Sequence, residues 1–290
     1  YLGFGLSPAV CICLVYVLDR KTALRREIRT AVRIEIGYLI FLFVTIPCGM
    51  VFSVSADNIY SRGPHFYIYV VMYFGAILYL SASTVITARE FQNRSRLLIY
   101  PLILFVMAET IIQVALPELH VTWLCVTLLS VLYFIYCSEM WNQLDALTGL
   151  LNQNSYLKQT GGVRCKGGVL VVFDVDDFKQ INDRYGHIQG DRCLAGIAEC
   201  IKKSYANFGY CYRIGGDEFC VLLKNGGNEG RCKQEFLQRL QEKRGEIAFL
   251  PTVSYGSAPF SGEDIVKVKD RADQDMYQYK KERKNRKRLS

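Results

Sequence analysis

The sequence lacks paired cysteines. It contains eleven cysteines, but no two of them are spaced as CxxC, and five lie in long apolar runs. Structural zinc sites built from cysteine use closely spaced pairs of ligands. The pattern therefore excludes a structural metal site made of cysteines and is typical of free thiols in a reducing compartment.

The sequence also lacks a basic face interleaved with aromatic residues, which a nucleic-acid reader would need. The net charge is +8, but much of the excess lies in two short loops between apolar runs and in the tail 280–288. Basic residues at such membrane-proximal and terminal positions do not form a groove-binding surface. We therefore expect no nucleic-acid partner.

The two halves of the chain differ sharply in composition. Residues 1–137 hold long apolar runs, whereas the remainder alternates apolar and charged residues as a water-soluble fold does. A membrane-spanning helix needs about 20 predominantly apolar residues. Five stretches fit this requirement or nearly fit it: 2–18, 34–54, 67–87, 98–116 and 121–137. The sequence thus predicts an α-helical multi-span membrane domain of about five helices over 1–137, with the lipid bilayer as its partner.

The loops predict the orientation of these spans. Arginine and lysine are frequent in the loops after the first and third stretches, while 55–66 holds only Arg62 as a strong base and 117–120 holds none. Because cytoplasmic loops carry the excess of Lys and Arg, the soluble half should lie in the cytoplasm. This topology leaves Tyr1 outside, so we expect an earlier span in a longer protein.

One acidic residue falls inside an expected span. Glu109 lies in the fourth stretch, and Gln113 follows one turn later on the same helical face. Ionisable groups within a membrane are costly and are therefore candidates for function. Two interpretations stay open: a role in sensing a signal, or a protonated or cavity-facing residue that packs helices together.

The soluble half begins after a short helical linker at 138–144, which should continue the last span. Residues 167–174 read GGVLVVFD, a continuous apolar run typical of a buried strand that ends at Asp174. A dense set of polar residues follows at 175–183. Taken alone, this segment has a second interpretation, an ordinary polar loop that caps a helix.

A second cluster of acids lies between two strand-like runs. Residues 211–214 and 219–223 flank Gly215-Gly216-Asp217-Glu218, which is the spacing of a β-hairpin with glycines at its turn. Glycines let a backbone approach a ligand closely, and adjacent acids repel one another unless a cation is present. Asp217 with Asp174 would make a hard-oxygen site suited to Mg²⁺.

These motifs together resemble the GGDEF diguanylate cyclase family over roughly residues 145–285. The resemblance rests on several ordered segments. They are DALTGLLN at 145–152, FDVD at 173–176 with the stretch up to Asp191, GGDEF at 215–219, TVSYG at 252–256, and Ala272-Asp273 with Met276, Tyr277 and Lys280. This order and spacing is far more specific than a lone GGDEF.

The resemblance implies a fold and a reaction for residues 145–290. The fold would be a palm-like α/β (α+β) domain with a class III nucleotidyl cyclase-like, mostly antiparallel sheet. The domain would sit in the cytoplasm, anchored to the bacterial inner membrane. Two GTP would condense into cyclic di-GMP and two pyrophosphates, with Mg²⁺ or Mn²⁺ as cofactor. Each domain holds one GTP, so catalysis would require a homodimer.

The resemblance also implies residue roles. Metal ligands would be Asp174, the carbonyl of Val175, and Asp217, which is also the expected proton acceptor, and Glu218 would be required beside them. The phosphates would be met by Lys179, Lys280, backbone amides near Asp177 and Phe178, and Lys284, with Gly215 and Gly216 permitting close approach. Guanine would be read by Asn182 and Asp191, while His187 would either approach the ligand or serve structure alone.

Other readings remain. One is a non-catalytic GGDEF-like module that binds GTP or cyclic di-GMP and signals by contact, and another is a cyclase with a different product. The family's RxxD product-inhibition site is replaced here by Ala206, Asn207, Phe208 and Gly209, so feedback by that route is not expected. No EAL- or HD-type hydrolytic cluster is present, and degradation of the product is not predicted.

Overall fold

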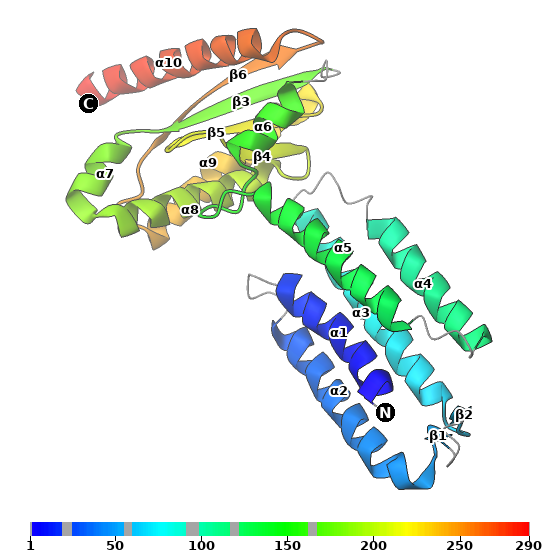
Figure 1. The fold of residues 1–290 in the computed structure, drawn as a ribbon. Coiled ribbons are helices and arrows are strands. Elements are labelled where there is room, and N and C mark those ends of the chain that lie inside the picture. The colour runs from blue at the N-terminus through cyan, green and yellow to red at the C-terminus, as the bar shows by residue number, and fades with distance from the viewer. Residues whose placement is uncertain are drawn as a thin grey trace. The chain divides into compact units, whose positions relative to one another are not determined.

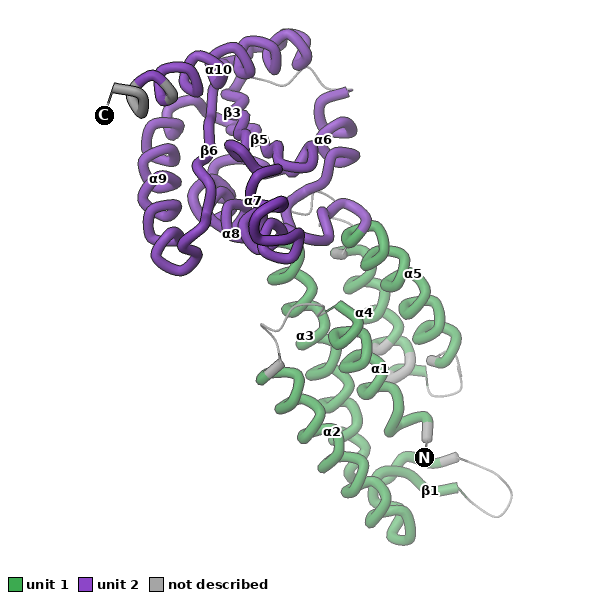
Figure 2. Tube along the Cα trace, turned by 90° about the vertical axis from the view of Figure 1, so that its left-hand side faces the viewer, with its two compact units in different colours: residues 1–141 green, residues 142–290 purple. Residues whose placement is uncertain are grey.

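The computed structural model describes residues 2–18, 25–54, 60–90, 99–116, 122–161 and 167–289. The chain divides into two compact units, residues 1–141 and 142–290, coloured separately in Figure 2. Each unit has a hydrophobic core of its own. The two units are therefore described one at a time.

The first unit consists mainly of helices (Figure 1). They are α1 (Leu2–Leu18), α2 (Arg25–Thr45), α3 (Tyr67–Glu90), α4 (Ile99–Ala115) and α5 (Thr122–Asn142). A short antiparallel ribbon pairs β1 (Phe52–Val54) with β2 (Tyr60–Arg62). Its core is built from aliphatic and tyrosine side chains, among which Tyr69 and Tyr73 stack with ring centroids 5.9 Å apart.

The second expected stretch, 34–54, overlaps helix α2, whose bounds differ from those of the stretch. Helix α2 begins at Arg25, because arginine and glutamate are good helix formers even where they are too polar for an apolar window. It ends at Thr45, where a single 3₁₀ turn (Ile46–Cys48) contains Pro47 and leads to Gly49 at φ 57°. Proline cannot continue the hydrogen-bond ladder, and a left-handed glycine reverses the chain.

Three helices among the described residues are long and apolar enough to cross a membrane. They cover Arg26–Cys48, Tyr67–Arg89 and Trp123–Asn142, and two shorter apolar helices cover Gly3–Leu18 and Tyr100–Glu109. The arrangement of five membrane spans stays a prediction. Helix α5 continues through the expected linker as far as Asn142, after which Leu144 forms a β-bridge with Leu151.

The second unit is built on a four-stranded sheet of β3 (Gly168–Val175), β4 (Gly209–Arg213), β5 (Glu218–Leu223) and β6 (Val253–Phe260). The strand order is β4-β5-β3-β6, and all neighbouring pairs are antiparallel. The predicted buried strand and the predicted hairpin are both confirmed. The helices are α6 (Gln153–Thr160), α7 (Phe178–Tyr185), α8 (His187–Tyr205), α9 (Glu229–Glu246) and α10 (Ile265–Leu289).

Helices cover both faces of this sheet (Figure 1). Phe173 of β3 packs in a cluster with Ile197 of α8 and Phe236 of α9. Its neighbour Val172 packs on the opposite face, in a cluster that includes Val268 of α10. A strand buried on both faces reads as a continuous apolar run, which is why β3 was visible in the sequence.

Helix α10 lies directly against β6 at a glycine. A Cβ atom on Gly256 would lie 2.2 Å from the backbone nitrogen of Met276 and 2.3 Å from the carbonyl oxygen of Ala272. Only glycine permits so close an approach of helix and strand. The approach sets the height of α10 above the sheet and so positions Lys280, one turn after Met276.

The cysteines within the described residues are all free thiols. In the second unit Cys193 and Cys200 are buried, and burial raises the pKa of each thiol to about 11. A buried thiol of raised pKa is chemically inert. The predicted absence of cysteine pairing therefore agrees with the described part of the chain.

Candidate active site

Two acids lie opposite each other on the two central strands, near one end of the sheet. Asp174 of β3 is the register partner of Glu218 of β5. Like charges directly opposite one another in an antiparallel pair are destabilising. A cation between or beside the two carboxylates would therefore relieve their repulsion.

Asp217 lies beside this pair at the end of the hairpin. The backbone N–H of Val175 donates to the carbonyl oxygen of Asp217 at 3.2 Å, which joins the end of β3 to the hairpin turn. The register of β3 and β5 thus brings the backbones of Asp174, Val175 and Asp217 to the same end of the sheet. These are the three residues predicted to hold metal.

The oxygen ligands at this site fit a metal whose coordination is completed by oxygen atoms of the substrate. No group of three or more His, Cys, Asp or Glu side chains within the described ranges is placed to hold an ion alone. Two carboxylates and a carbonyl are hard oxygen ligands, and Mg²⁺ commonly binds through one or two carboxylates plus substrate phosphates. The residues present therefore fit Mg²⁺ or Mn²⁺ bound together with a triphosphate.

Lys280 provides a cation at this site. Its Nζ lies 2.5 Å from Oδ2 of Asp174 and 3.3 Å from Oδ1 of Asp176. Burial alone would lower the pKa of Lys280, but the hydrogen bond to Asp174 and the two negative charges raise it above its usual range. The lysine expected at the phosphates thus contacts a predicted metal ligand here.

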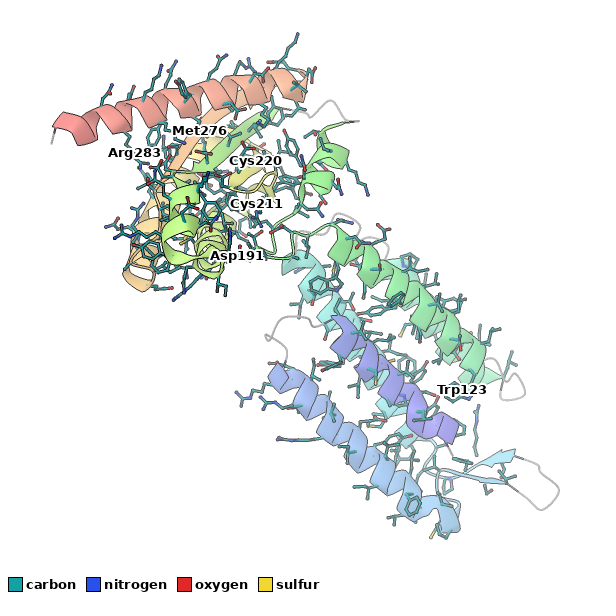
Figure 3. The ribbon with its side chains drawn as sticks, turned by 60° about the vertical axis from the view of Figure 1, so that its left-hand side comes forward. Trp123, Asp191, Cys211, Cys220, Met276 and Arg283 are labelled. Atoms are coloured by element: carbon teal, nitrogen blue, oxygen red, sulfur yellow. The ribbon has the colours of Figure 1, made fainter. Side chains whose placement is uncertain are left out.

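Asp176 organises a buried network that the sequence analysis missed. Its carboxylate is 7% exposed and accepts hydrogen bonds from Thr252 Oγ1 at 2.8 Å and Ser254 Oγ at 2.7 Å. Arg283 on α10 also lies 3.1 Å from it (Figure 3). Strand alternation could not place Asp176, because it lies in the turn after β3. The network fixes α10 over the end of β3.

The start of α7 presents backbone N–H groups. Asp177 has φ 54°, and within the described ranges it is the sole residue other than glycine with positive φ. The first backbone bond of the helix runs from the Gln180 N–H to the Asp177 carbonyl. The N–H groups of Phe178 and Lys179 precede that bond, and such groups form a ready site for an anion.

Asn182 and Asp191 lie on adjoining helices, α7 and α8 respectively. A Cβ atom on Gly190 would lie 1.9 Å from Asn182 Oδ1, so the amide packs directly on the α8 backbone. Asn182 Oδ1 is buried and has no hydrogen-bond partner among the described residues. Buried polar atoms are normally paired, so this oxygen is available to a ligand. Asp191, which is labelled in Figure 3, is exposed and follows Gly190 in α8. His187, at the start of α8, is also exposed.

The contact between Gly190 and Asn182 leads to a prediction. Gly190→Ala should displace the Asn182 amide and raise KM for GTP about tenfold, since a hydrogen bond to the base is worth about 1.4 kcal/mol. The fold should persist because the clash is with a side chain. Steady-state kinetics measure the effect. Gly230→Ala on α9, where a Cβ meets nothing within 4 Å, is the control and should leave KM unchanged.

Arg213 supports the hairpin turn, a role that was also missed. Its Nη2 donates to the carbonyl oxygen of Gly216 at 2.7 Å, and its Nη1 lies 3.0 Å from Oδ1 of Asp145. Asp145 in turn accepts hydrogen bonds from the backbone N–H and the hydroxyl of Thr148. The first and third motifs of the resemblance are therefore physically joined through one guanidinium.

The Asp145 interactions should make stability depend on pH. Burial alone would raise the pKa of Asp145, but the hydrogen bonds from Thr148 and Arg213 more than offset it and hold the pKa below its usual range. The stabilisation is complete above the unfolded value of about 3.9 and is lost as pH falls through the lower folded value. Asp145→Asn should therefore flatten the acid limb of the unfolding free energy of residues 142–290, measured by urea titration between about pH 6 and pH 2.5.

Arg213→Gln should flatten the same limb, because it removes one partner of Asp145. An acid limb that stays parallel to the wild-type curve in both variants would contradict the assignment. The two substitutions therefore test one interaction from its two ends.

The signature glycines are not required by the turn itself. Neither Gly215 nor Gly216 has positive φ, and a Cβ atom on Gly216 would meet nothing within 4 Å. The surface at Gly216 is thus open to an incoming ligand. Among the other predicted residues, Lys179 is exposed on α7, and the side chain of Lys284 lies outside the described residues.

Comparison with known proteins bears directly on this site. The family model described as "Diguanylate cyclase, GGDEF domain" matches residues 142–286. The chain belongs to the GGDEF family. The matched range begins where the second unit begins and ends within α10. It includes Lys280 and Arg283 of that helix.

Curated relatives are similar over the same half of the chain. The diguanylate cyclase DgcP of Pseudomonas aeruginosa is 35% identical over 49% of this chain and 23% of its own length. DgcS of Shewanella oneidensis is 32% identical over 50% of this chain and 52% of its own. The chain thus spans from about a quarter to about half the length of these two GGDEF-family relatives.

Solved structures match the same region. The GGDEF domain of DgcB from Caulobacter crescentus, in complex with c-di-GMP, is 27% identical. The match covers 48% of this chain and 90% of that chain, with a TM-score of 0.39.

Proposed function

We propose that this GGDEF protein is a diguanylate cyclase that condenses two GTP into cyclic di-GMP and two pyrophosphates. The observation that carries the proposal is the pairing of Asp174 with Glu218 beside Asp217 at one end of the sheet. All three acids of a metal-dependent phosphoryl-transfer site are retained. A module that only binds nucleotide would not need them all.

The residues divide the work by location. Asp174, the Val175 carbonyl and Asp217 would hold Mg²⁺ or Mn²⁺, which when bound neutralises the triphosphate and activates the attacking hydroxyl. Glu218 adds negative charge beside these ligands. Lys179 binds the β and γ phosphates through its positive charge. The first backbone N–H groups of α7 bind the same phosphates through the positive ends of their dipoles. Lys280 reaches them from α10 once it leaves Asp174.

The base is read at α7 and α8. Asp191 accepts the N1–H and N2–H₂ donors of guanine, and the Asn182 amide supplies a second polar contact. Adenine does not present those donors in that arrangement, so the Asp191 carboxylate would lack its hydrogen-bond donors with ATP. A site of this kind rejects the wrong base strongly.

The chemistry requires two domains. The 3′-hydroxyl of one GTP attacks the α-phosphate of the other, a P–O bond forms, and pyrophosphate leaves with the electron pair of the broken bond. Asp217 accepts the proton of the attacking hydroxyl. A second transfer in the opposite sense closes the ring. Because each domain holds one nucleotide, the active form is a homodimer.

We further propose that the first unit anchors the protein in the bacterial inner membrane, with the cyclase domain in the cytoplasm. Support comes from the three helices of membrane-spanning length and from arginine-rich loops after the first and third apolar stretches. GTP is a cytoplasmic substrate, which agrees with this orientation.

The deciding experiment incubates the whole 290-residue chain with GTP and Mg²⁺ or Mn²⁺ and identifies the product by mass. Cyclic di-GMP is the expected product. Binding of GTP without turnover, under conditions where a control cyclase works, would favour the non-catalytic module instead. A different cyclic dinucleotide would keep the site and change the substrate assignment.

A further inference from the structure

The first unit contains a cavity of about 570 Å³ that has no part in the cyclase site. Its walls come from α2 and α3, and Ile12 contributes from α1. Pockets that bind small organic ligands commonly have volumes of about 300 to 1,000 Å³. The cavity is thus large enough for a small molecule with an apolar body.

A buried carboxylate lines this cavity. Glu35 of α2 is 5% exposed, and neither of its carboxylate oxygens has a hydrogen-bond partner among the described residues. A buried polar group without a partner costs free energy, and a buried charge costs more. Ionisable residues inside membrane helices are therefore retained where they have a task. The Glu35 carboxylate is thus a hydrogen-bond acceptor that has no donor among the described residues.

The charge of the lining indicates which ligand it would take. Glu27 and Glu35 are acidic and Arg26 is basic, so the charged side chains of the lining leave a net charge of −1 when all are ionised. The opposite wall, on α3, is mainly apolar or small, and its residues are Val71, Met72, Gly75, Ala76 and Tyr79, of which only Tyr79 carries a polar group. A cation with N–H donors on one end and an apolar body on the other complements both walls.

The α3 wall has room for a larger side chain at Gly75. Gly75 lines the cavity, and a Cβ atom built on it would meet nothing within 4 Å. A larger side chain there would project into open volume without displacing the helix. Gly37 of α2 also has nothing within 4 Å but does not line the cavity, so it provides a matched control.

We propose that this cavity binds a small organic amine, with the ammonium group donating hydrogen bonds to Glu35 and the apolar body lying against α3. The proposal does not rest on cyclase activity. It assigns to the first unit a ligand defined by charge and shape, and it places the recognition of the ammonium group in α2.

The test measures binding to the 290-residue chain in lipid nanodiscs by equilibrium dialysis at neutral pH. The probes are tryptamine and hexylamine, each compared with its uncharged alcohol, tryptophol or hexanol. At least one amine should bind saturably with one site per chain and at least tenfold more tightly than its alcohol. Failure of both amines to saturate, or equal binding of amine and alcohol, overturns the proposal.

Variants locate the site. Glu35→Gln should weaken amine binding at least tenfold, and Gly75→Leu should abolish it by filling the cavity. Gly37→Leu and Glu139→Gln, an exposed acid on α5, should bind as wild type. Should Glu35→Gln fail to fold, Gly75→Leu against Gly37→Leu still decides. Unchanged amine binding in folded Glu35→Gln or Gly75→Leu overturns the assignment of the cavity.

Discussion

Asp217→Asn is expected to lower kcat for cyclic di-GMP formation by about a thousandfold or more. The substitution keeps the size of the side chain but removes the charge that binds metal and accepts the proton. A metal ion supplies several kcal/mol of transition-state stabilisation, and about 4 kcal/mol corresponds to a factor of a thousand. The initial rate of product formation from GTP with saturating Mg²⁺ is the measurement.

Asp270→Asn provides the control for Asp217→Asn. Asp270 is an exposed acid of α10, and its loss changes the net charge equally. Its rate should match wild type. Turnover of Asp217→Asn within about tenfold of wild type would show that the hairpin acid does not hold the metal.

Asp191→Ala is expected to lower kcat/KM for GTP by about a hundredfold and to remove discrimination by the guanine amino group. Hydrogen bonds to a charged group are worth about 1.5 to 3 kcal/mol. Inosine triphosphate retains N1–H but lacks the N2 amino group. Wild type should therefore prefer GTP over ITP, whereas Asp191→Ala should use the two nucleotides almost equally.

The kcat/KM values of wild type and Asp191→Ala, each measured with GTP and with ITP, form a double-mutant type of cycle. The cycle isolates the contact between Asp191 and the N2 amino group. A preference for GTP that survives unchanged in Asp191→Ala would assign guanine reading to other residues. Asp270→Ala serves as the matched control and should keep the wild-type preference.

The sheet of the second unit could be predicted because its signals are local. Strand β3 is buried on both faces and therefore appears as one apolar run that ends in Asp174. The hairpin appears as two short runs around Gly215 and Gly216. Pairing of Asp174 with Glu218 then required only that β3 and β5 be neighbours in the expected register.

The supports of the site could not be predicted in the same way. Arg213 and Asp145 are separated by 68 residues, and Asp176 and Ser254 by 78. No periodic pattern records such a contact, because it depends on which loops the fold brings together. Lys280 was expected to face phosphate, and in the structure its ammonium group contacts the carboxylate of Asp174.

The first unit shows a different limit. Glu109 attracted notice because it interrupts an apolar window, whereas Glu35 stood at the edge of the expected stretch 34–54 among arginines and glutamates. An apolar window treats such a residue as part of the membrane boundary. Only the packing of α2 with its neighbours reveals that Glu35 is buried and lines a cavity.

If Asp174 holds the metal as proposed, its ion pair with Lys280 makes the lysine a competitor of that metal. A divalent ion that arrives alone must displace an ammonium group 2.5 Å from its ligand. A triphosphate that arrives with the ion offers the ammonium group a new partner and lowers the cost of displacement. Metal and nucleotide should therefore each increase the affinity of the other by the same factor, as thermodynamic linkage requires. On the proposed assignment, the ion pair therefore disfavours the binding of magnesium without the triphosphate.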